Sequence, residues 1–328
     1  MTASISGDTT ATPGDADRLA SPPWVECRDV NGLDAEALAG WLRQHHDRIA
    51  TAITATGAVL FRETGVRTSA EFGRVCQVLT PMLLPYIGGA TPRSALEGLV
   101  YTSTEYAAQA SIPLHCEATY QSQVPSRIWF FCRVPPTDRG ETPLGDMRRV
   151  RSRLPATLVD EFRERGLVYL TNLRDGPGFG KSWAQSYGTT DRAEVEALIR
   201  EQGAEWEWRP DGGLVVRLRA PALRRHSATG AEIWTNQAVN WHPAHFGADH
   251  VHKLQAAFGD ESRFPKSVMF GDGGSIPAAA IETIAAALRA EEHAFRWRRG
   301  DILLVDNEVI AHGRRPFSGE RAIDVAMA

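Results

Sequence analysis

The 328-residue sequence is poor in lysine. Its 36 basic residues include three lysines, Lys181, Lys253 and Lys266, and the others are arginines. The codon bias of a GC-rich genome explains this imbalance as well as a function does. Because 40 acidic residues outnumber the basic ones, the formal net charge is −4. A nucleic-acid-binding protein normally carries a basic face, so we expect no nucleic-acid partner.

Cysteines and long apolar runs are also scarce. The four cysteines are scattered at positions 27, 76, 116 and 132, without a CxxC pair. This pattern excludes a disulfide framework and suits a reducing compartment. No run of about 18 apolar residues is long enough to span a bilayer. The first residues lack the basic and apolar regions of a signal peptide. We therefore expect a cytoplasmic protein with no membrane partner.

The pattern of polar and apolar residues predicts one domain behind a leader. Residues 1–22 are rich in Thr, Ser, Gly, Asp and Pro, which predicts disorder. Residues 23–328 are expected to form a single domain. Helical periodicity predicts helices over 34–56, 68–82, 147–166 with a break at Pro155, 191–203 and 276–295. Strands are predicted over 57–63, 99–106, 112–121, 126–135, 167–175, 206–223 as a hairpin, 233–242, 295–314 and 320–328.

The order of these elements indicates the fold class. Strands are interspersed with helices, but there is no regular strand–helix–strand alternation. This favours an α+β domain built round an antiparallel β-core with helices outside. The glycine-rich segment 176–183 matches no phosphate-binding motif, and we interpret it as a mobile active-site loop.

One pair of residues indicates metal chemistry. His115 and Glu117 lie two residues apart in a predicted strand, so both side chains would project from the same face. An isolated pair of this kind is also common on the polar face of an ordinary strand. His312, just after the apolar run DILLVD, is a plausible third ligand. Two histidines and one carboxylate form the facial triad that holds Fe(II) and leaves three coordination positions open.

Several segments in the same order resemble the TauD/TfdA superfamily of Fe(II)/2-oxoglutarate dioxygenases. They are LHCEATY, PSRIWFFCRVPPTDRGETPLGDMRRV, WTNQAVNWH and RRGDILLVDNEVIAHGRRPFSGERAIDVAM. The resemblance covers roughly residues 25–328 and is greatest to the SyrP-like and clavaminate-synthase-like members. It implies a double-stranded β-helix (jelly-roll, cupin-like) core with surrounding helices. It also implies Fe(II), 2-oxoglutarate as co-substrate, and O₂.

The resemblance assigns roles to individual residues. It implies His115, Glu117 and His312 as the iron ligands. Thr142, which lies 25 residues after Glu117, matches the family's threonine that contacts 2-oxoglutarate. Arg321 matches the arginine that pairs with the distal carboxylate of 2-oxoglutarate. A guanidinium suits this task because its two parallel N–H groups orient a carboxylate.

Two other arginines remain open as partners of 2-oxoglutarate. Arg321 follows His312 by nine residues, an interval shorter than in several relatives. Arg314 and Arg315 are the alternatives, although they come directly after the metal ligand rather than on the final strand.

The implied reaction is hydroxylation of an unactivated C–H bond, with release of succinate and CO₂. The expected substrate is a small molecule in specialised metabolism such as antibiotic biosynthesis. It would be an amino acid or a derivative, free or bound to a carrier protein. Halogenating family members replace the carboxylate ligand with Gly or Ala, so the retained Glu117 predicts hydroxylation, desaturation or epoxidation. The candidate substrate-side residues are Asn236, Gln237, Trp183, Asn172, Arg174 and His242.

Two other functions compete with the oxygenase. A zinc or other metal hydrolase could use the same three ligands, but it would not need Thr142 and Arg321. A non-catalytic jelly-roll binding protein would be expected to have lost a ligand, and the sequence retains all three. The sequence does not indicate the substrate or the oligomeric state.

Overall fold

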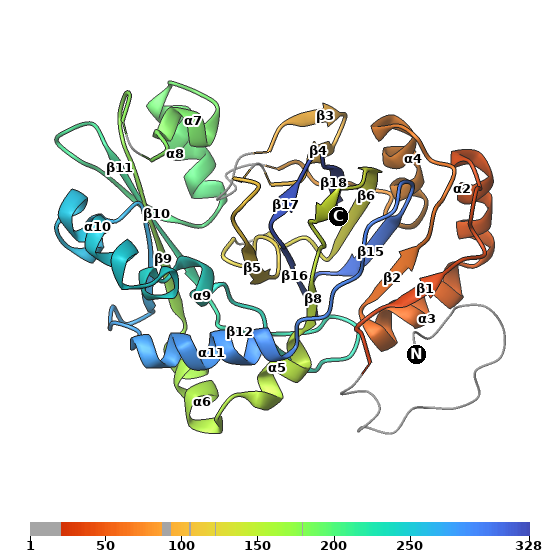
Figure 1. Cartoon of the computed structure of the whole chain (residues 1–328). Coiled ribbons are helices and arrows are strands. Elements are labelled where there is room, and N and C mark those ends of the chain that lie inside the picture. Colours follow the sequence, from red (N-terminus) through yellow and green to blue (C-terminus); the bar gives the residue numbers. More distant parts are fainter. Residues whose placement is uncertain (1–20, 87–92, 105, 122, 179) are drawn as a thin grey trace.

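The computed structural model describes residues 21–86, 93–104, 106–121, 123–178 and 180–328 (Figure 1). Of the expected leader 1–22, all but the last two residues lie outside this part of the chain. No helix in the described ranges is long and apolar enough to cross a membrane.

The largest sheet has seven strands in the order β1-β2-β15-β6-β18-β4-β3. Its strands are β1 Val25–Cys27, β2 Ala58–Phe61, β3 Ala95–Glu97, β4 Val100–Thr102, β6 Arg127–Val134, β15 Ile302–Asp306 and β18 Ala322–Met327. The pair β1–β2 is parallel and the other pairs are antiparallel. β15 is buried along its whole length, which explains its continuous apolar run: both faces of the strand are covered.

Alternate residues of this sheet pack into two hydrophobic clusters. Ile302 and Leu304 pack with residues of the helices on the outer face, whereas Leu303 and Val305 pack in the main core. The outer helices are α2 Ala35–Gln44, α3 His46–Thr56 and α4 Ser69–Leu79, and Figure 1 shows them along one flank of the molecule. The sequence predicted one helix over 34–56. The chain divides at His45, whose ring stacks on Trp41 and whose Nδ1 bonds the Trp41 carbonyl.

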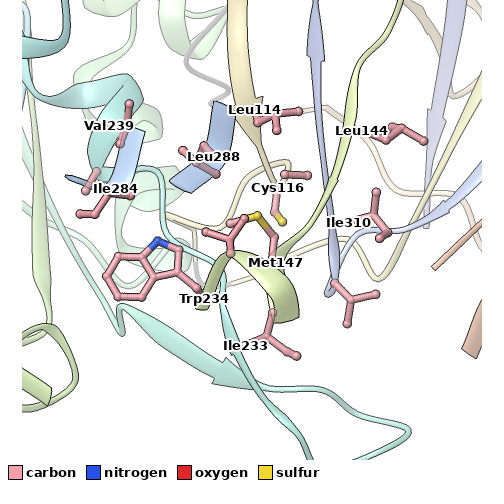
Figure 2. Close-up of a cluster of buried hydrophobic side chains, with 14 of the residues drawn as sticks. Leu114, Cys116, Leu144, Met147, Ile233, Trp234, Val239, Ile284, Leu288 and Ile310 are labelled. Carbon is pink, nitrogen blue, oxygen red and sulfur yellow. The ribbon is translucent and has the colours of Figure 1, made fainter. Parts of the chain in front are cut away.

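A three-stranded sheet, in the order β5-β16-β8, packs against the inner face of the large sheet. Its strands are β5 Ile112–His115, β8 Leu144–Asp146 and β16 Ile310–Arg314. Figure 2 shows side chains of this sheet, among them Leu114 and Leu144, in a buried cluster with Leu288 of α11 (Ala278–Ala290). The two packed sheets form the jelly-roll core.

A four-stranded antiparallel sheet, β10-β11-β9-β14, lies beside the jelly roll (Figure 1). Its strands are β9 Leu167–Leu173, β10 Glu205–Trp208, β11 Leu214–Ala220 and β14 Lys266–Phe270. β10 and β11 pair as the predicted hairpin. The sheet packs with α7 (Trp183–Tyr187) and α8 (Arg192–Glu201) round a small core of its own.

The remaining elements connect these layers. They are β7 Asp138–Arg139, β12 Leu223–Arg225, β13 Glu232–Trp234, β17 Phe317–Ser318, α5 Met147–Arg153, α6 Ala156–Arg165, α9 Ala238–Trp241, α10 Ala248–Phe258 and the 3₁₀ helices η1 Pro243–Phe246 and η2 Glu261–Arg263. The break at Pro155 agrees with the sequence prediction, and a capping box formed by Thr68 and Glu71 starts α4.

Three strand predictions were wrong. The expected strand 112–121 ends at His115, within the site described below. The expected strand 233–242 ends at Trp234 and the chain then forms α9, because the Asn236 side chain accepts a hydrogen bond from the Ala238 amide and starts a helical turn. The expected strand 295–314 divides into β15 and β16, which belong to different sheets. This division carries His312 out of the large sheet and into the small one.

Candidate active site

The three predicted metal ligands lie together between the two sheets of the jelly roll. His115 ends β5 and pairs directly with His312 of β16, so both rings project from the same face of the small sheet. Their ring centroids are 4.6 Å apart, and His312 Nε2 lies 3.8 Å from Glu117 Oε2. One possible ligand atom from each residue lies within 4.8 Å of the others. The three side chains are therefore a candidate ligand set for one metal ion.

Glu117 reaches this position from a turn, not from a strand as predicted. β5 ends at His115, and Ala118 has a φ of 55° in the left-handed region. The side-chain amide of Asn307 holds the turn: its Oδ1 accepts from the Glu117 amide at 2.7 Å, and its Nδ2 donates to the Glu117 carbonyl at 3.0 Å. Asn307 is fully buried and precedes β16. It therefore ties the segment of the carboxylate to the strand that carries His312.

The electrostatics favour the protonation states that bind a metal. Burial lowers the pKa of His115 to about 4, with a contribution from neighbouring His312, so the imidazole is neutral. Its Nδ1 lies 2.9 Å from the Pro113 carbonyl, which leaves the Nε2 lone pair available. Burial alone would raise the pKa of Glu117, but Arg93 and the two histidines hold it below its usual range. A neutral imidazole and an ionised carboxylate are the forms of these side chains that bind a metal ion.

The donor set fits Fe(II). Two neutral imidazoles and a carboxylate form the ligand set of non-haem iron oxygenases, and none of the three is a thiolate that would favour zinc. His312 Nδ1 is buried without a hydrogen-bond partner among the described residues. Cys116, between two of the ligands, is buried in the main core.

Arg93 is part of this site, and the sequence did not indicate it. Its Nη2 donates to Glu117 Oε2, its side chain is 2% exposed, and its guanidinium lies 4.9 Å from the centroid of the Tyr86 ring. Its Nε and Nη1 have no hydrogen-bond partner in the described part of the chain. The arginine therefore supports the carboxylate and still offers donors to a bound group.

Thr142 and Arg321 line a narrow cavity beside the ligands. The cavity is also lined by Arg93, His115 and His312. Arg321 Nη2 donates to Thr142 Oγ1 at 3.4 Å, and the Trp297 indole donates to the same oxygen at 3.0 Å. Burial, with the like charge of Arg314, lowers the pKa of Arg321 to about 10. A buried guanidinium beside a hydroxyl suits a carboxylate.

The two alternative arginines are otherwise engaged. Arg314 lines the cavity, but its Nη atoms donate to the carbonyls of Tyr106, Ala107 and Ala110. Arg315 does not line it and pairs with Glu292 at 2.9 Å. Arg321 Nε also donates to the Gly140 carbonyl, but its Nη atoms donate to the hydroxyls of Ser103 and Thr142, and both of these residues line the cavity. The geometry therefore favours Arg321 over both.

A second, larger cavity of about 470 Å³ begins at the metal ligands. Its lining includes His115 and Glu117 at one end and residues of β9, β11 and β14 at the other. It shares Thr104, Ile112 and His115 with the narrow cavity. This arrangement allows one molecule to occupy the narrow cavity and another to approach the same metal from the larger one.

Only two of the predicted substrate-side residues line the large cavity. Gln237 donates from Nε2 to the Cys116 carbonyl at 2.7 Å, and Asn172 donates to the carbonyls of Ser262 and Phe264. The glycine-rich loop contributes Gly180 and Lys181, which sequence reasoning did not select.

The other four candidates lie outside both cavities, where their contacts are structural. Asn236 makes two hydrogen bonds to backbone atoms, and His242 bonds a backbone carbonyl and a backbone amide. Arg174 donates to a glycine carbonyl within its own loop. Trp183 packs edge-on against a second tryptophan in the core of the four-stranded sheet. Polarity and position in the sequence did not distinguish these residues from cavity residues.

Comparison with known proteins gives matches along nearly the whole chain. The model of the family described as "Taurine catabolism dioxygenase TauD, TfdA family" matches residues 19–327. Dapdiamide synthesis protein DdaC of Enterobacter agglomerans is 35% identical over 282 residues, which cover 86% of this chain and 85% of that protein. Clavaminate synthase-like protein At3g21360 of Arabidopsis thaliana is 32% identical over 277 residues, which cover 82% of this chain and 80% of that protein.

Solved structures with the same fold support the jelly-roll core. A putative alpha-ketoglutarate-dependent taurine dioxygenase from Burkholderia xenovorans superposes with a TM-score of 0.52 at 16% identity, covering 93% of this chain and 88% of that one. An asparagine oxygenase crystallised with Fe(II), 3-hydroxyasparagine and succinate has a TM-score of 0.50 at 15% identity, and the match covers 90% of this chain and 83% of that one. The predicted α+β fold with a jelly-roll core is confirmed.

Proposed function

The chain belongs to the TauD/TfdA family of dioxygenases, and from this premise we propose that it hydroxylates an unactivated C–H bond of an amino acid or an amino-acid-derived molecule. It is an Fe(II)/2-oxoglutarate-dependent oxygenase that uses O₂ and acts on a small molecule. The observation that carries the proposal is the convergence of His115, Glu117 and His312 where the narrow cavity of Thr142 and Arg321 meets the larger one.

We assign the residues to roles as follows. His115, Glu117 and His312 hold the iron, and the turn-held carboxylate keeps its orientation through Asn307. When bound, the iron, 2-oxoglutarate and O₂ supply an oxidant that removes hydrogen from a C–H bond, while the co-substrate leaves as succinate and CO₂.

The co-substrate's distal carboxylate would lie at Arg321 and Thr142. Their mutual hydrogen bond fixes both groups before binding, and the Trp297 indole restrains the threonine oxygen. A fixed guanidinium fork orients the carboxylate and leaves the other end of the molecule directed towards the metal ligands. Burial of this end of the site also excludes bulk water from the reacting centre.

The names of relatives support an amino-acid substrate. One relative is a dapdiamide synthesis protein, and one protein of the same fold was crystallised with a hydroxylated asparagine. We extend this to a free or carrier-bound amino acid in a biosynthetic pathway. We also propose that residues 23–328 act as one domain, because the family match spans nearly all of them. The non-catalytic alternative loses support because the three ligand side chains converge.

The test is anaerobic titration of the purified protein with Fe(II) and 2-oxoglutarate. Formation of the weak visible charge-transfer band of the iron chelate is expected. On admission of air, succinate should form faster in the presence of an amino-acid substrate, and the product mass should rise by one oxygen atom. A product that has lost two hydrogens would indicate desaturation. Absence of the band together with absence of succinate would contradict the oxygenase assignment.

A further inference from the structure

Arg93 has hydrogen-bond donors that its contact with the metal site does not use. Its Nη2 donates to Glu117 Oε2, whereas its Nε and Nη1 are buried without a hydrogen-bond partner among the described residues. The side chain is 2% exposed, so bulk water does not reach these donors. Burying an unpaired donor of a charged group is unfavourable. The two donors therefore indicate a bound group that accepts hydrogen bonds from them.

The position of Arg93 indicates on which side of the metal ligands that group lies. Arg93 lines the narrow cavity with His115 and His312, and it is not among the described residues that line the large cavity. Glu117 lines the large cavity and is not among the described residues of the narrow one. The guanidinium thus lies between the carboxylate ligand and the narrow cavity, on the side assigned to the co-substrate.

The narrow cavity has a guanidinium at each of two places. Arg321 donates to the hydroxyl of Thr142, and Arg93 donates to Glu117. No hydrogen-bond partner in the described part of the chain is common to both arginines. One guanidinium is therefore placed at the threonine and the other at a metal ligand. 2-Oxoglutarate also has two anionic groups, one at each end of the molecule.

The keto end of a 2-oxo acid requires a hydrogen-bond donor. Such an acid chelates a metal ion through its keto oxygen and one oxygen of the C1 carboxylate. The other oxygen of that carboxylate stays uncoordinated and carries negative charge. In a buried site this oxygen is unfavourable unless a donor meets it, and a donor from a charged group makes the stronger hydrogen bond.

We propose that Arg93 donates to the uncoordinated oxygen of the C1 carboxylate of 2-oxoglutarate while it continues to hold Glu117. One planar group then joins a metal ligand to the co-substrate. Arg93 orients the keto end of the molecule, as Arg321 orients the distal carboxylate. This inference rests on the proposed function and adds a second arginine to its co-substrate site.

Titration of the anaerobic Fe(II) protein with two 2-oxo acids tests the proposal. 2-Oxoglutarate has both carboxylates, whereas 2-oxobutyrate has the keto group and the C1 carboxylate but no distal carboxylate. The dissociation constant of each acid is read from the chelate band at saturating Fe(II). The affinity for Fe(II) alone is measured separately by equilibrium dialysis. The variants are Arg93→Met, Arg93→Lys and Arg321→Ala.

Arg93→Met should raise the dissociation constants of both acids by a similar factor, roughly 10- to 100-fold, because both lose the same charged hydrogen bond. Arg321→Ala should raise the constant of 2-oxoglutarate only. Unchanged constants for both acids in Arg93→Met, or an increase for 2-oxoglutarate alone, would overturn the inference.

Arg93→Lys is the conservative variant, because it keeps a charged donor. It should raise the two constants by a smaller factor than Arg93→Met, since an ammonium group cannot hold Glu117 and the co-substrate in the same planar arrangement. If the methionine variant does not fold or does not bind Fe(II), the lysine variant provides the same comparison. Wild-type constants for both acids in Arg93→Lys would then contradict the proposal.

Asn307→Ala separates this role from support of Glu117 alone. Asn307 holds the backbone of Glu117 but is not among the described residues that line the narrow cavity. Asn307→Ala and Arg93→Met should both lower the affinity for Fe(II). At saturating Fe(II), only Arg93→Met should raise the dissociation constants of the 2-oxo acids. Equal increases in the two variants would mean that Arg93 acts only through Glu117, and the inference would be wrong.

The wild type separates this inference from the proposed function. If the wild type forms the chelate band and Arg93→Met keeps its affinity for both acids, the role of Arg93 is wrong and the oxygenase assignment stands. If the wild type forms no band with 2-oxoglutarate, the oxygenase assignment itself fails.

Discussion

The candidate site has two halves that are built in different ways. The metal half contains His115, Glu117 and His312 with the narrow cavity of Thr142 and Arg321, and the substrate half is the larger cavity. The metal half lies between the two sheets of the jelly roll, where Glu117, Thr142 and His312 are buried. Hydrogen bonds hold the turn of Glu117 and join Arg321 to Thr142. The substrate half is formed by the four-stranded sheet, α9, α10 and the glycine-rich loop. For the first half, spacing indicated His115 and Glu117, and the family resemblance indicated Thr142 and Arg321. For the second half, sequence reasoning selected four residues that line neither cavity.

The reason for this difference is geometric. A metal ion fixes the bond lengths and the arrangement of its ligands. The ligand residues are therefore restricted to a few positions on neighbouring strands, and these positions give a recognisable spacing in the sequence. A substrate cavity needs only groups of suitable polarity, and these can come from any element that reaches it. The predictions below separate the two halves by changing one at a time.

The largest expected effect is the loss of iron binding in His312→Ala. Removing an imidazole from the three-residue set leaves two ligands, and the chelate band and succinate formation should disappear. Anaerobic titration with Fe(II) and 2-oxoglutarate measures this. In Lys266→Met, a change confined to the substrate half, the band should be retained. A chelate band of normal intensity in His312→Ala would remove His312 from the metal half.

The next largest effect is expected for Arg321→Ala. Loss of the charged hydrogen bonds to the distal carboxylate should cost about 3 kcal/mol, or roughly a 100-fold higher dissociation constant for 2-oxoglutarate. Arg315→Ala is the matched control and should leave this constant unchanged, because Arg315 pairs with Glu292 outside the cavity. The opposite pattern in the two variants would mean that the arginine assignment is wrong. The constant is read from the chelate band.

Asn307→Ala tests whether a residue that touches no ligand atom positions the metal half. It leaves the Glu117 amide, the Glu117 carbonyl and the Pro125 carbonyl without their side-chain partner. We expect an iron affinity roughly 10- to 100-fold lower and a free energy of unfolding about 3 kcal/mol smaller. Iron titration at a temperature where the variant is folded separates the two effects. Reduced stability with unchanged iron affinity would show that Asn307 is only structural.

The smallest effect is expected outside both halves, at Glu232. Hydrogen bonds from Arg163, and then from Arg151, lower the pKa of this carboxyl to about 2 against a small opposing effect of burial. Its ionised form therefore stabilises the fold at pH values above its unfolded pKa of about 4.3, and this contribution is lost as the pH falls towards 2. Because the side chain is partly exposed, Glu232→Gln should cost less than about 1 kcal/mol at pH 7. Denaturant unfolding at pH 7 and pH 3 measures this, and a difference that grows at low pH would contradict it.

Much of the fold could be predicted from the sequence, with errors at the points where the chain changes direction. The apolar runs of β6 and β15 predicted buried strands, and Pro155 predicted the break between α5 and α6. The strand expected to continue through Glu117 ends two residues earlier. The alternation of polar and apolar residues along the chain cannot reveal where this strand ends, because Asn307, which stabilises the turn after it, is far away in the sequence.

The scarcity of lysine in the sequence does not by itself indicate where the lysines lie in the fold. Only the structure shows that Lys181 and Lys266 line one cavity while Lys253 is exposed. Arg93 provided no comparable signal: nothing in its surroundings distinguishes it from the many arginines of the chain. Its contact with Glu117 exists only because the segments before β3 and after β5 fold together.

The α+β fold class and the candidate metal ligands His115, Glu117 and His312 could be predicted from the sequence, since residue periodicity and ligand chemistry are local properties of the chain. The tertiary structure decides which arginine reaches Thr142, how the carboxylate of Glu117 is held, and which residues line the substrate cavity. Each of these depends on pairs of groups far apart in the sequence, and the energy of a buried charge or hydrogen bond depends on its partner's position in space.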